Sequence, residues 1–148
     1  MRTREFKPVL SALLLLSLCL GASAGFAAQN PGEKALKEFE RVKKMNNDLA
    51  IAHFTNQIKK DPKSAVAYAK RGKAYSGNRD YDKAVVDYEK SMALDPKLAE
   101  PYVGRAVVRL MKKDFNNCWE DVHKAESLGG TFWPSFMDTL KAESGRDK

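Results

Sequence analysis

The chain has 148 residues, of which 43% are apolar, and its 26 Lys and Arg against 19 Asp and Glu give a formal net charge of +7. This composition is typical of one globular domain and argues against an intrinsically disordered chain. Two cysteines and two histidines in the whole sequence exclude a disulfide-stabilised scaffold and very nearly exclude a structural zinc site.

Residues 1–24 have the layout of a secretory signal peptide: a basic head, an uncharged leucine-rich stretch at residues 9–20, and small residues for cleavage after Ala24. An uncleaved membrane anchor is the alternative, because the uncharged run extends to about Ala28. Lipidation of Cys19 is disfavoured, since Leu18 precedes it where a small residue is required. We therefore expect an exported protein, periplasmic or secreted, and the absence of any Asn-x-Ser/Thr sequon favours a bacterial host.

Cleavage would remove three basic residues and one acidic residue and lower the net charge from +7 to +5. A modest positive charge on an exported protein argues against nucleic acid as the natural partner. Cys118 is the one cysteine left after cleavage, so no intramolecular disulfide is expected.

A period of 34 residues organises the rest of the chain, because Asp61-Pro62-Lys63 recurs as Asp95-Pro96-Lys97. The segment between them carries apolar and small residues at the spacing of the tetratricopeptide repeat signature: Tyr68, Gly72, Tyr75, Ala84, Tyr88 and Pro96. Residues 31–130 therefore resemble this family. Two positions depart from its pattern, since Arg71 replaces the usual leucine and Arg79 stands where glycine often makes the turn between helices.

The resemblance implies an all-α fold, a helix-turn-helix solenoid of about three tetratricopeptide repeats with a C-terminal capping helix. Three two-helix repeats and a capping helix give about six or seven helices. The hairpins are expected to stack, because one hairpin cannot bury its apolar stripe without a neighbour. The predicted divisions follow the period: a short flexible lead at 25–32, a repeat array at 33–130 made of a degenerate repeat (33–64), the best-formed repeat (65–98) and a looser third one (99–130), and a capping helix with tail at 131–148. In the degenerate repeat, the apolar stripe of the first helix is out of register with the others: Leu36, Phe39, Val42 and Met45.

Large apolar residues follow the last repeat directly, and Pro134 suits the first turn of a short helix. They are Phe132, Trp133, Phe136 and Leu140. We interpret this cluster as the cover of the last repeat, with an aromatic binding cage as the alternative.

No catalytic residue, metal ligand or cofactor is predicted. His53 and His123 have no Ser, Cys or carboxylate at the spacing of a catalytic triad, which favours surface positions. Cys118 stands one repeat after Ala84, so we interpret it as a small buried residue and not as a nucleophile. The acidic residues of the second helices lack the glycine-bearing loop of a calcium site and indicate a solvated face.

Arg71 and Asp87 recur 34 residues later as Arg105 and Asp121. This recurrence predicts an ion pair within each hairpin. Placed near the surface, such a pair would stabilise the fold by about 0 to 1 kcal/mol.

The resemblance implies a non-enzymatic interaction module, in which the first helices line a concave groove that holds a peptide or the surface of a partner protein. An accessory or regulatory subunit of an exported enzyme or envelope assembly, with no free peptide ligand, is the alternative. The sequence leaves the partner and the oligomeric state open.

The predicted partner-binding residues lie at groove positions of the first helices: Val66, Lys70, Lys73, Val103, Val107, Leu110 and Met111. The apolar strip of the third repeat has Lys70, Lys73 and Lys112 beside it, which favours a peptide with apolar anchors and some acidic residues. In the competing interpretation, the out-of-register first helix covers this strip and leaves no free groove.

Members of the family that grip the terminal carboxylates of a peptide use Lys, Asn and Arg at fixed groove positions. The matching positions in this chain hold Ala35, Phe39, Lys70, Glu100 and Gly104. Because only Lys70 fits that pattern, no carboxylate clamp is expected.

Overall fold

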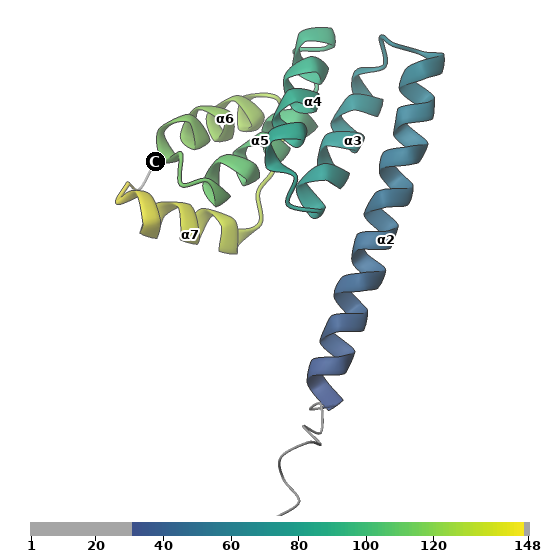
Figure 1. Ribbon diagram of the computed structural model, residues 1–148. Helices are drawn as coiled ribbons and strands as arrows, with labels where there is room; N and C mark the ends of the chain where they lie inside the picture. The colour runs from purple at the N-terminus through teal and green to yellow at the C-terminus, as the bar shows by residue number, and fades with distance from the viewer. Residues whose placement is uncertain (1–30, 147–148) are drawn as a thin grey trace, which may run out of the picture. The chain divides into compact units, whose positions relative to one another are not determined.

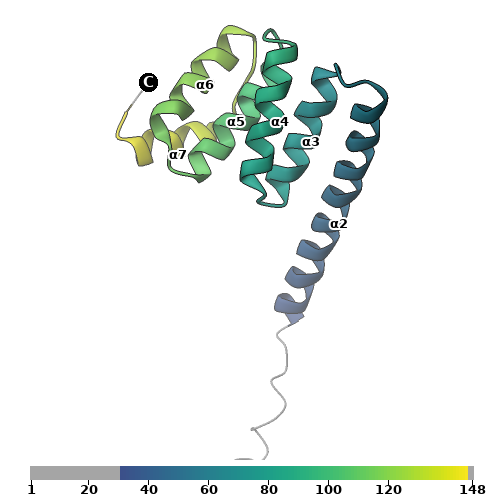
Figure 2. The same ribbon diagram turned by 45° about the horizontal axis from the view of Figure 1, so that its top comes forward.

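The computed structural model describes residues 31–146, and this part of the chain is α-helical without any strand (Figures 1 and 2). Its six helices are, in chain order, α2 (Pro31–Lys60), α3 (Ala65–Gly77), α4 (Tyr81–Leu94), α5 (Ala99–Met111), α6 (Phe115–Ser127) and α7 (Pro134–Ser144). The all-α fold and the expected number of helices are thus confirmed. The predicted signal peptide, Cys19 and most of the predicted lead lie outside the described residues, and residues 31 and 32 of that lead begin α2.

The chain divides into two units, Met1–Phe39 and Glu40–Lys148, and the second contains the helical hairpins. In it α3 pairs with α4 and α5 pairs with α6, while α5 also packs against α3 and α4 (Figure 2). None of the six described helices is both long and apolar enough to cross a membrane.

The 34-residue period is visible in the backbone at the end of each second helix. The Asp61 carboxylate accepts a hydrogen bond from the amide of Lys63 at 3.0 Å, and Asp95 accepts the same bond from Lys97 at 3.0 Å. Each bond closes a short turn that the following proline rigidifies. The next first helix can therefore start in the same place, and at α3 the Ser64 hydroxyl caps it by accepting from the Ala67 amide at 3.3 Å.

The turns inside the two hairpins are also equivalent. Arg79 has φ 65° and Lys113 has φ 59°, so both residues take the left-handed conformation that glycine adopts at lower cost. Although Arg79 replaces the usual glycine, the turn keeps the left-handed conformation that glycine would adopt, at the cost of backbone strain.

The first predicted repeat, residues 33–64, does not have the expected structure. Instead of a hairpin over 33–64, the chain forms one continuous helix, α2. The reason is local: the position equivalent to Arg79 is Met45, and Lys44 forms an i,i+4 ion pair with Asp48 at 2.7 Å across the expected turn. Arg79 and Lys113 favour a left-handed turn no more than Met45 does, but their hairpins bury apolar side chains. In α2 a hairpin would gain no core and helix continuation is the lower-energy path, because the equivalent packing positions hold charged residues: Lys34, Lys37, Glu38 and Arg41.

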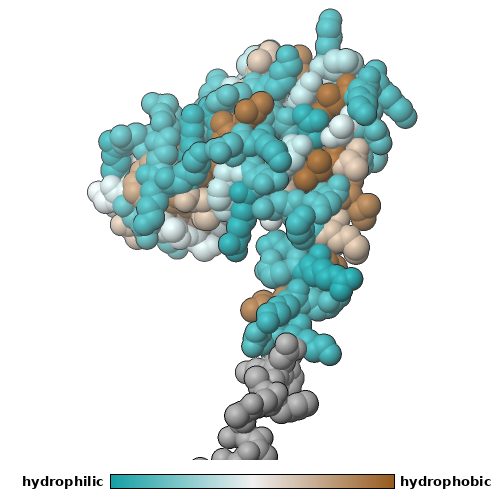
Figure 3. All heavy atoms as spheres, viewed as in Figure 1, coloured by the Kyte–Doolittle hydropathy of each residue, from teal (hydrophilic) through white to brown (hydrophobic). Residues whose placement is uncertain are grey.

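As a consequence, the apolar stripe at the start of α2 is exposed. Its four predicted residues are between 41% and 62% exposed, and Leu49, further along the helix, is 64% exposed. Figure 3 shows apolar spheres interrupting a mostly hydrophilic surface along α2. Residues 32–60 include no buried side chain, and side-chain hydrogen bonds such as Asn47 to Asn78 at 3.0 Å join α2 to the first hairpin.

The buried side chains of the hairpins form two clusters. One lies between α4 and α5 around Tyr88 and Val108. The other joins α5, α6 and α7, where Phe136 and Leu140 of α7 pack against Trp119 and its neighbours. The capping role predicted for the C-terminal helix therefore fits these two residues, which are 3% and 0% exposed.

Candidate functional site

A pocket of about 210 Å³ opens between α3 and α5. Its lining combines apolar, aromatic and charged residues: Lys73, Ser76, Tyr88, Glu100, Val103, Gly104, Val107 and Trp133. Cavities that hold small organic ligands usually measure about 300 to 1,000 Å³, so this pocket has room for about one side chain of a partner.

Three of the predicted partner-binding residues line this pocket: Lys73, Val103 and Val107. Val66, Lys70 and Met111 are exposed but do not line it. Their role in binding stays a prediction.

The structure corrects the prediction for Leu110. This side chain is only 6% exposed, because it belongs to the core cluster that α7 covers. Val107 has a double position, since it lines the pocket and also packs against the same cluster. The apolar strip expected along the third repeat is therefore partly core.

The charged side chains around the strip also differ from the expectation. Lys112 forms an ion pair with Asp82 of α4 at 2.7 Å, so its charge already has a partner within the protein. Glu100, a half-buried residue in the first turn of α5, lines the pocket together with Lys73. The pocket consequently presents charges of both signs.

Trp133 forms one wall of the pocket from the segment that precedes α7. Its side chain is 51% exposed, and its ring meets the ring of Phe136 edge-on with 5.5 Å between centroids. The C-terminal aromatic cluster thus divides into a buried cap and one exposed wall residue. Residues 40–60 of α2, which belong to the same unit as the hairpins, do not line the pocket.

Tyr88 reaches the pocket from α4 by passing between the two helices that border it. A Cβ atom on Gly72 of α3 would lie 2.9 Å from the Tyr88 ring, and one on Gly104 of α5 would lie 2.4 Å from it. Both glycines therefore leave room for this ring. Burial and the nearby Glu100 raise the pKa of the Tyr88 hydroxyl well above its ordinary value, so it stays protonated.

The sequence pattern predicted Tyr88 only as a residue of the repeat signature and Trp133 only as part of the cap, and it did not indicate that both line a pocket. One signal for Tyr88 is present in the sequence. The equivalent residue of the preceding unit is Phe54, so the hydroxyl is an addition at a position where a plain aromatic ring suffices for packing.

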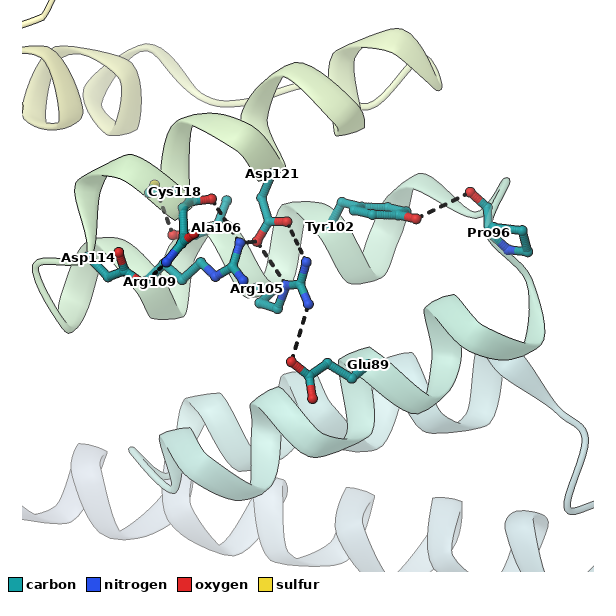
Figure 4. A network of polar contacts seen from close by, with 10 residues as sticks. Glu89, Pro96, Tyr102, Arg105, Ala106, Arg109, Asp114, Cys118 and Asp121 are labelled. Atoms are coloured by element: carbon teal, nitrogen blue, oxygen red, sulfur yellow. Dashed lines mark hydrogen bonds and ion pairs between the residues drawn. The ribbon is translucent and has the colours of Figure 1, made fainter.

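The ion pairs predicted within the hairpins are confirmed. Arg71 donates to both carboxylate oxygens of Asp87 at 2.7 Å each. Arg105 donates to those of Asp121 at 3.0 and 2.8 Å, as Figure 4 shows. The carboxylates are not near the surface as expected, because Asp87 is 4% and Asp121 is 2% exposed. The hydrogen bonds that the Arg71 guanidinium donates to Asp87 raise the pKa of Arg71.

Each of these arginines also reaches the preceding helix. Arg71 donates to the hydroxyl of Thr55 on α2 at 3.3 Å. Arg105 donates to the carboxylate of Glu89 on α4 at 3.3 Å, as Figure 4 shows. One guanidinium therefore ties three consecutive helices together.

The candidate nucleophile and bases have surroundings that fit structural roles. The Cys118 thiol is fully buried, donates to the carbonyl of Ala106 at 3.2 Å, and has its pKa raised to about 12 by burial. His53 and His123 are exposed, and the His123 ring lies 5.7 Å from that of Trp119. No group of His, Cys, Asp or Glu side chains within residues 31–146 could hold a metal ion.

Residues 65–98 match the tetratricopeptide repeat family model. No curated protein matches the chain. Among solved structures, the first TPR domain of Spaghetti (RPAP3), bound to the HSP90 peptide SRMEEVD, is 24% identical with a TM-score of 0.60, and the match covers 76% of this chain and 86% of that one. The Sgt2 TPR domain from Aspergillus fumigatus is 22% identical with a TM-score of 0.58, covering 78% and 79%.

The TPR2AB domain of yeast Sti1, in a complex with pHSP90, is 21% identical with a TM-score of 0.60; the match covers 95% of this chain and 57% of that chain. Together with the described helices, these similarities show the fold, an all-α helical solenoid of tetratricopeptide repeats.

Proposed function

We propose that this chain is a non-enzymatic interaction module that binds a peptide segment of a partner protein at the pocket between α3 and α5. The observation that carries the proposal is the pocket lining, which joins the apolar walls Val103, Val107 and Trp133 to charged side chains of both signs. Buried anchor side chains supply most of the affinity in such interfaces, whereas charges around them set orientation and association rate. The similar TPR domains of Spaghetti, bound to the HSP90 peptide SRMEEVD, and of yeast Sti1, in a complex with pHSP90, support this function for the fold.

The test is selection of peptides from a random phage-displayed library on the purified protein, followed by calorimetric titration of the selected peptides. Val103→Asp places a charge in the pocket wall and is expected to weaken binding at least about tenfold, or 1.4 kcal/mol. Val86→Asp is the matched control, because Val86 is 65% exposed on α4 and outside the pocket. Equal binding by the two variants would exclude this pocket as the peptide site.

The peptide SRMEEVD serves as a comparison ligand. Only Lys70 matches the residues that family members use to grip terminal carboxylates. We therefore expect this peptide to bind no better than a scrambled peptide of the same composition.

We also propose that the protein acts after export, on the basis of the signal-like layout of residues 1–24. Mass spectrometry of the protein from its native cell tests this proposal. A mature chain that starts at Gly25 is the expected result, and an intact Met1 with the protein in the cytoplasmic fraction would contradict it.

An accessory subunit that docks permanently is the second candidate, favoured by the exposed apolar side chains of Val42, Met45 and Leu49 on α2. In that case Leu49→Glu should release the protein from its native assembly. Val103→Asp should have no such effect.

A further inference from the structure

The pocket contains polar side chains that the fold leaves unused. Four of its lining residues have a polar side chain: Lys73, Ser76, Tyr88 and Glu100. Within residues 31–146, none of these four side chains makes a hydrogen bond or an ion pair. Elsewhere in the hairpins, buried polar side chains such as Asp87, Ser91 and Asp121 are all satisfied.

Tyr88 is the most informative of the four, because the residue is 98% buried and its hydroxyl has no protein partner. Since no buried side-chain oxygen or nitrogen in residues 31–146 lacks a hydrogen bond, this hydroxyl is the part of the side chain that solvent reaches, and it does so in the pocket. The hydroxyl oxygen would lie 2.5 Å from a Cβ atom on Gly104, a residue that lines the pocket. A ligand that fills the pocket displaces the water on this hydroxyl, so a well-matched ligand replaces the lost hydrogen bond with a polar group of its own.

Glu100 defines the sign of the charge next to this hydroxyl. It is half-buried, lines the same pocket, and is close enough to raise the pKa of Tyr88 through its charge. A purely apolar ligand side chain would strip water from the carboxylate and the hydroxyl without replacing the lost hydrogen bonds. An acidic ligand group would meet Glu100 as a like charge.

We propose that the pocket binds the side chain of a lysine or arginine in the partner peptide. Its aliphatic stem would pack between Val103 and Val107, and its cationic head would donate to Glu100 and the Tyr88 hydroxyl. The exposed ring of Trp133 offers a face for the same cation. This inference rests on the proposed function and specifies its ligand.

Lys73 adds a second requirement on the ligand. It is exposed, on α3 across the pocket from Glu100 of α5, and has no acidic partner in the described chain. A carboxylate next to the basic residue of the peptide would pair with it. The recognised segment therefore carries both a basic and an acidic residue.

The test uses three capped tripeptides with alanine at both ends and lysine, arginine or norleucine in the centre. Norleucine keeps the aliphatic stem and lacks the charge. In amide chemical-shift titrations of the full chain up to about 10 mM, we expect the lysine and arginine tripeptides to shift the amides of Val103, Gly104 and Val107, and norleucine to bind at least about fivefold more weakly.

Two variants connect the preference to named atoms. Tyr88→Phe keeps the ring and removes the hydroxyl, so it should weaken binding of the lysine tripeptide about threefold or more without lowering the melting temperature. Glu100→Gln should abolish the preference for lysine over norleucine. Glu120→Gln is the matched control, because Glu120 is an exposed carboxylate on α6 outside the pocket.

Equal affinities for lysine and norleucine, or no shift with any tripeptide, would overturn the inference. So would a Tyr88→Phe variant that melts earlier but binds normally, since the hydroxyl would then have a structural role. These outcomes differ from a failure of the proposed function: library peptides that lack basic residues but depend on Val103 would leave the peptide site standing and remove only its specificity.

Discussion

At the scale of single residues, one aromatic ring sets the requirement for two glycines. Tyr88 fills the space that side chains at Gly72 and Gly104 would need. A glycine inside a helix costs about 1 kcal/mol relative to alanine, so its presence in the middle of α3 and of α5 is explained by this close contact.

We predict that Gly104→Ala lowers the free energy of unfolding by about 1 to 3 kcal/mol, because the new methyl group overlaps the Tyr88 ring. Gly77→Ala is the comparison, since its methyl group would displace the Asn47 side chain and its hydrogen bond to Asn78 but no aromatic ring. It should cost less than Gly104→Ala. Urea titrations of both variants measure the difference, and an equally stable Gly104→Ala variant would show that the ring can move aside.

The raised pKa of Cys118, about 12, predicts that this thiol is unreactive in the folded protein. At pH 8, a disulfide reagent should modify it only after unfolding in denaturant. Because the folded state holds the proton more tightly than the unfolded chain does, the thiol lowers stability as the pH rises above its ordinary pKa of about 8.5. Cys118→Ala should flatten this part of the pH profile; rapid labelling of the native protein would contradict the buried position.

At the scale of the helices, removing one partner of the buried ion pair in a hairpin costs more than removing one partner of a surface pair, because it leaves a charge without compensation. Asp87→Asn leaves the Arg71 guanidinium without its charged partner, and we expect a loss on the order of 3 kcal/mol in the free energy of unfolding. Asp82→Asn is the control, because Asp82 is paired with Lys112 but its side chain is 92% exposed. Thermal unfolding should show a large shift for the first variant and none for the second.

The two strained turns give a prediction of opposite sign. Glycine adopts the left-handed conformation of Arg79 and Lys113 without the steric cost of a Cβ atom. Arg79→Gly and Lys113→Gly should therefore each raise the free energy of unfolding, by up to about 1 kcal/mol. As a comparison, Lys83→Gly lies inside α4 and should lower the free energy of unfolding by a similar amount. Thermal unfolding measures all three variants, and a lower melting temperature for the two turn variants than for the parent would contradict the prediction.

At the scale of the whole molecule, the repeat period was sufficient to predict the two hairpins, their turns and their internal ion pairs. It misled at α2, because a shift of 34 residues transfers the family pattern and ignores that Lys44, Met45 and Asp48 favour a continuing helix. The period also predicted only some of the residues that line the pocket, among them Lys73, Val103 and Val107. Leu110 occupies a groove position in the repeat, but α7 covers it, and a helix outside the period cannot be placed from the period alone.

Burial is distributed unevenly along the described chain, which predicts uneven protection of backbone amides. Residues 32–60 contain no buried side chain, whereas α5 and α6 carry most of one core cluster. Amides of α2 should exchange with deuterium at least about tenfold faster than those of α5 and α6, measured by mass spectrometry of peptic fragments. Uniform protection would mean that α2 is covered by another molecule in solution.

The links made by Arg71 and Arg105 have a consequence for how this chain could be lengthened. Each arginine bonds 16 residues back and 16 residues forward, to Thr55 and Asp87 in one case and to Glu89 and Asp121 in the other. A tandem copy of residues 65–98 inserted after Leu98 would bring its own arginine to the original Glu89, and its own glutamate to Arg105. The segment is thus a transplantable module whose junctions are already complementary. The series ends at α7, because Thr139 stands one period after Arg105 and His123 one period after Glu89, so the arginine–glutamate pair does not recur.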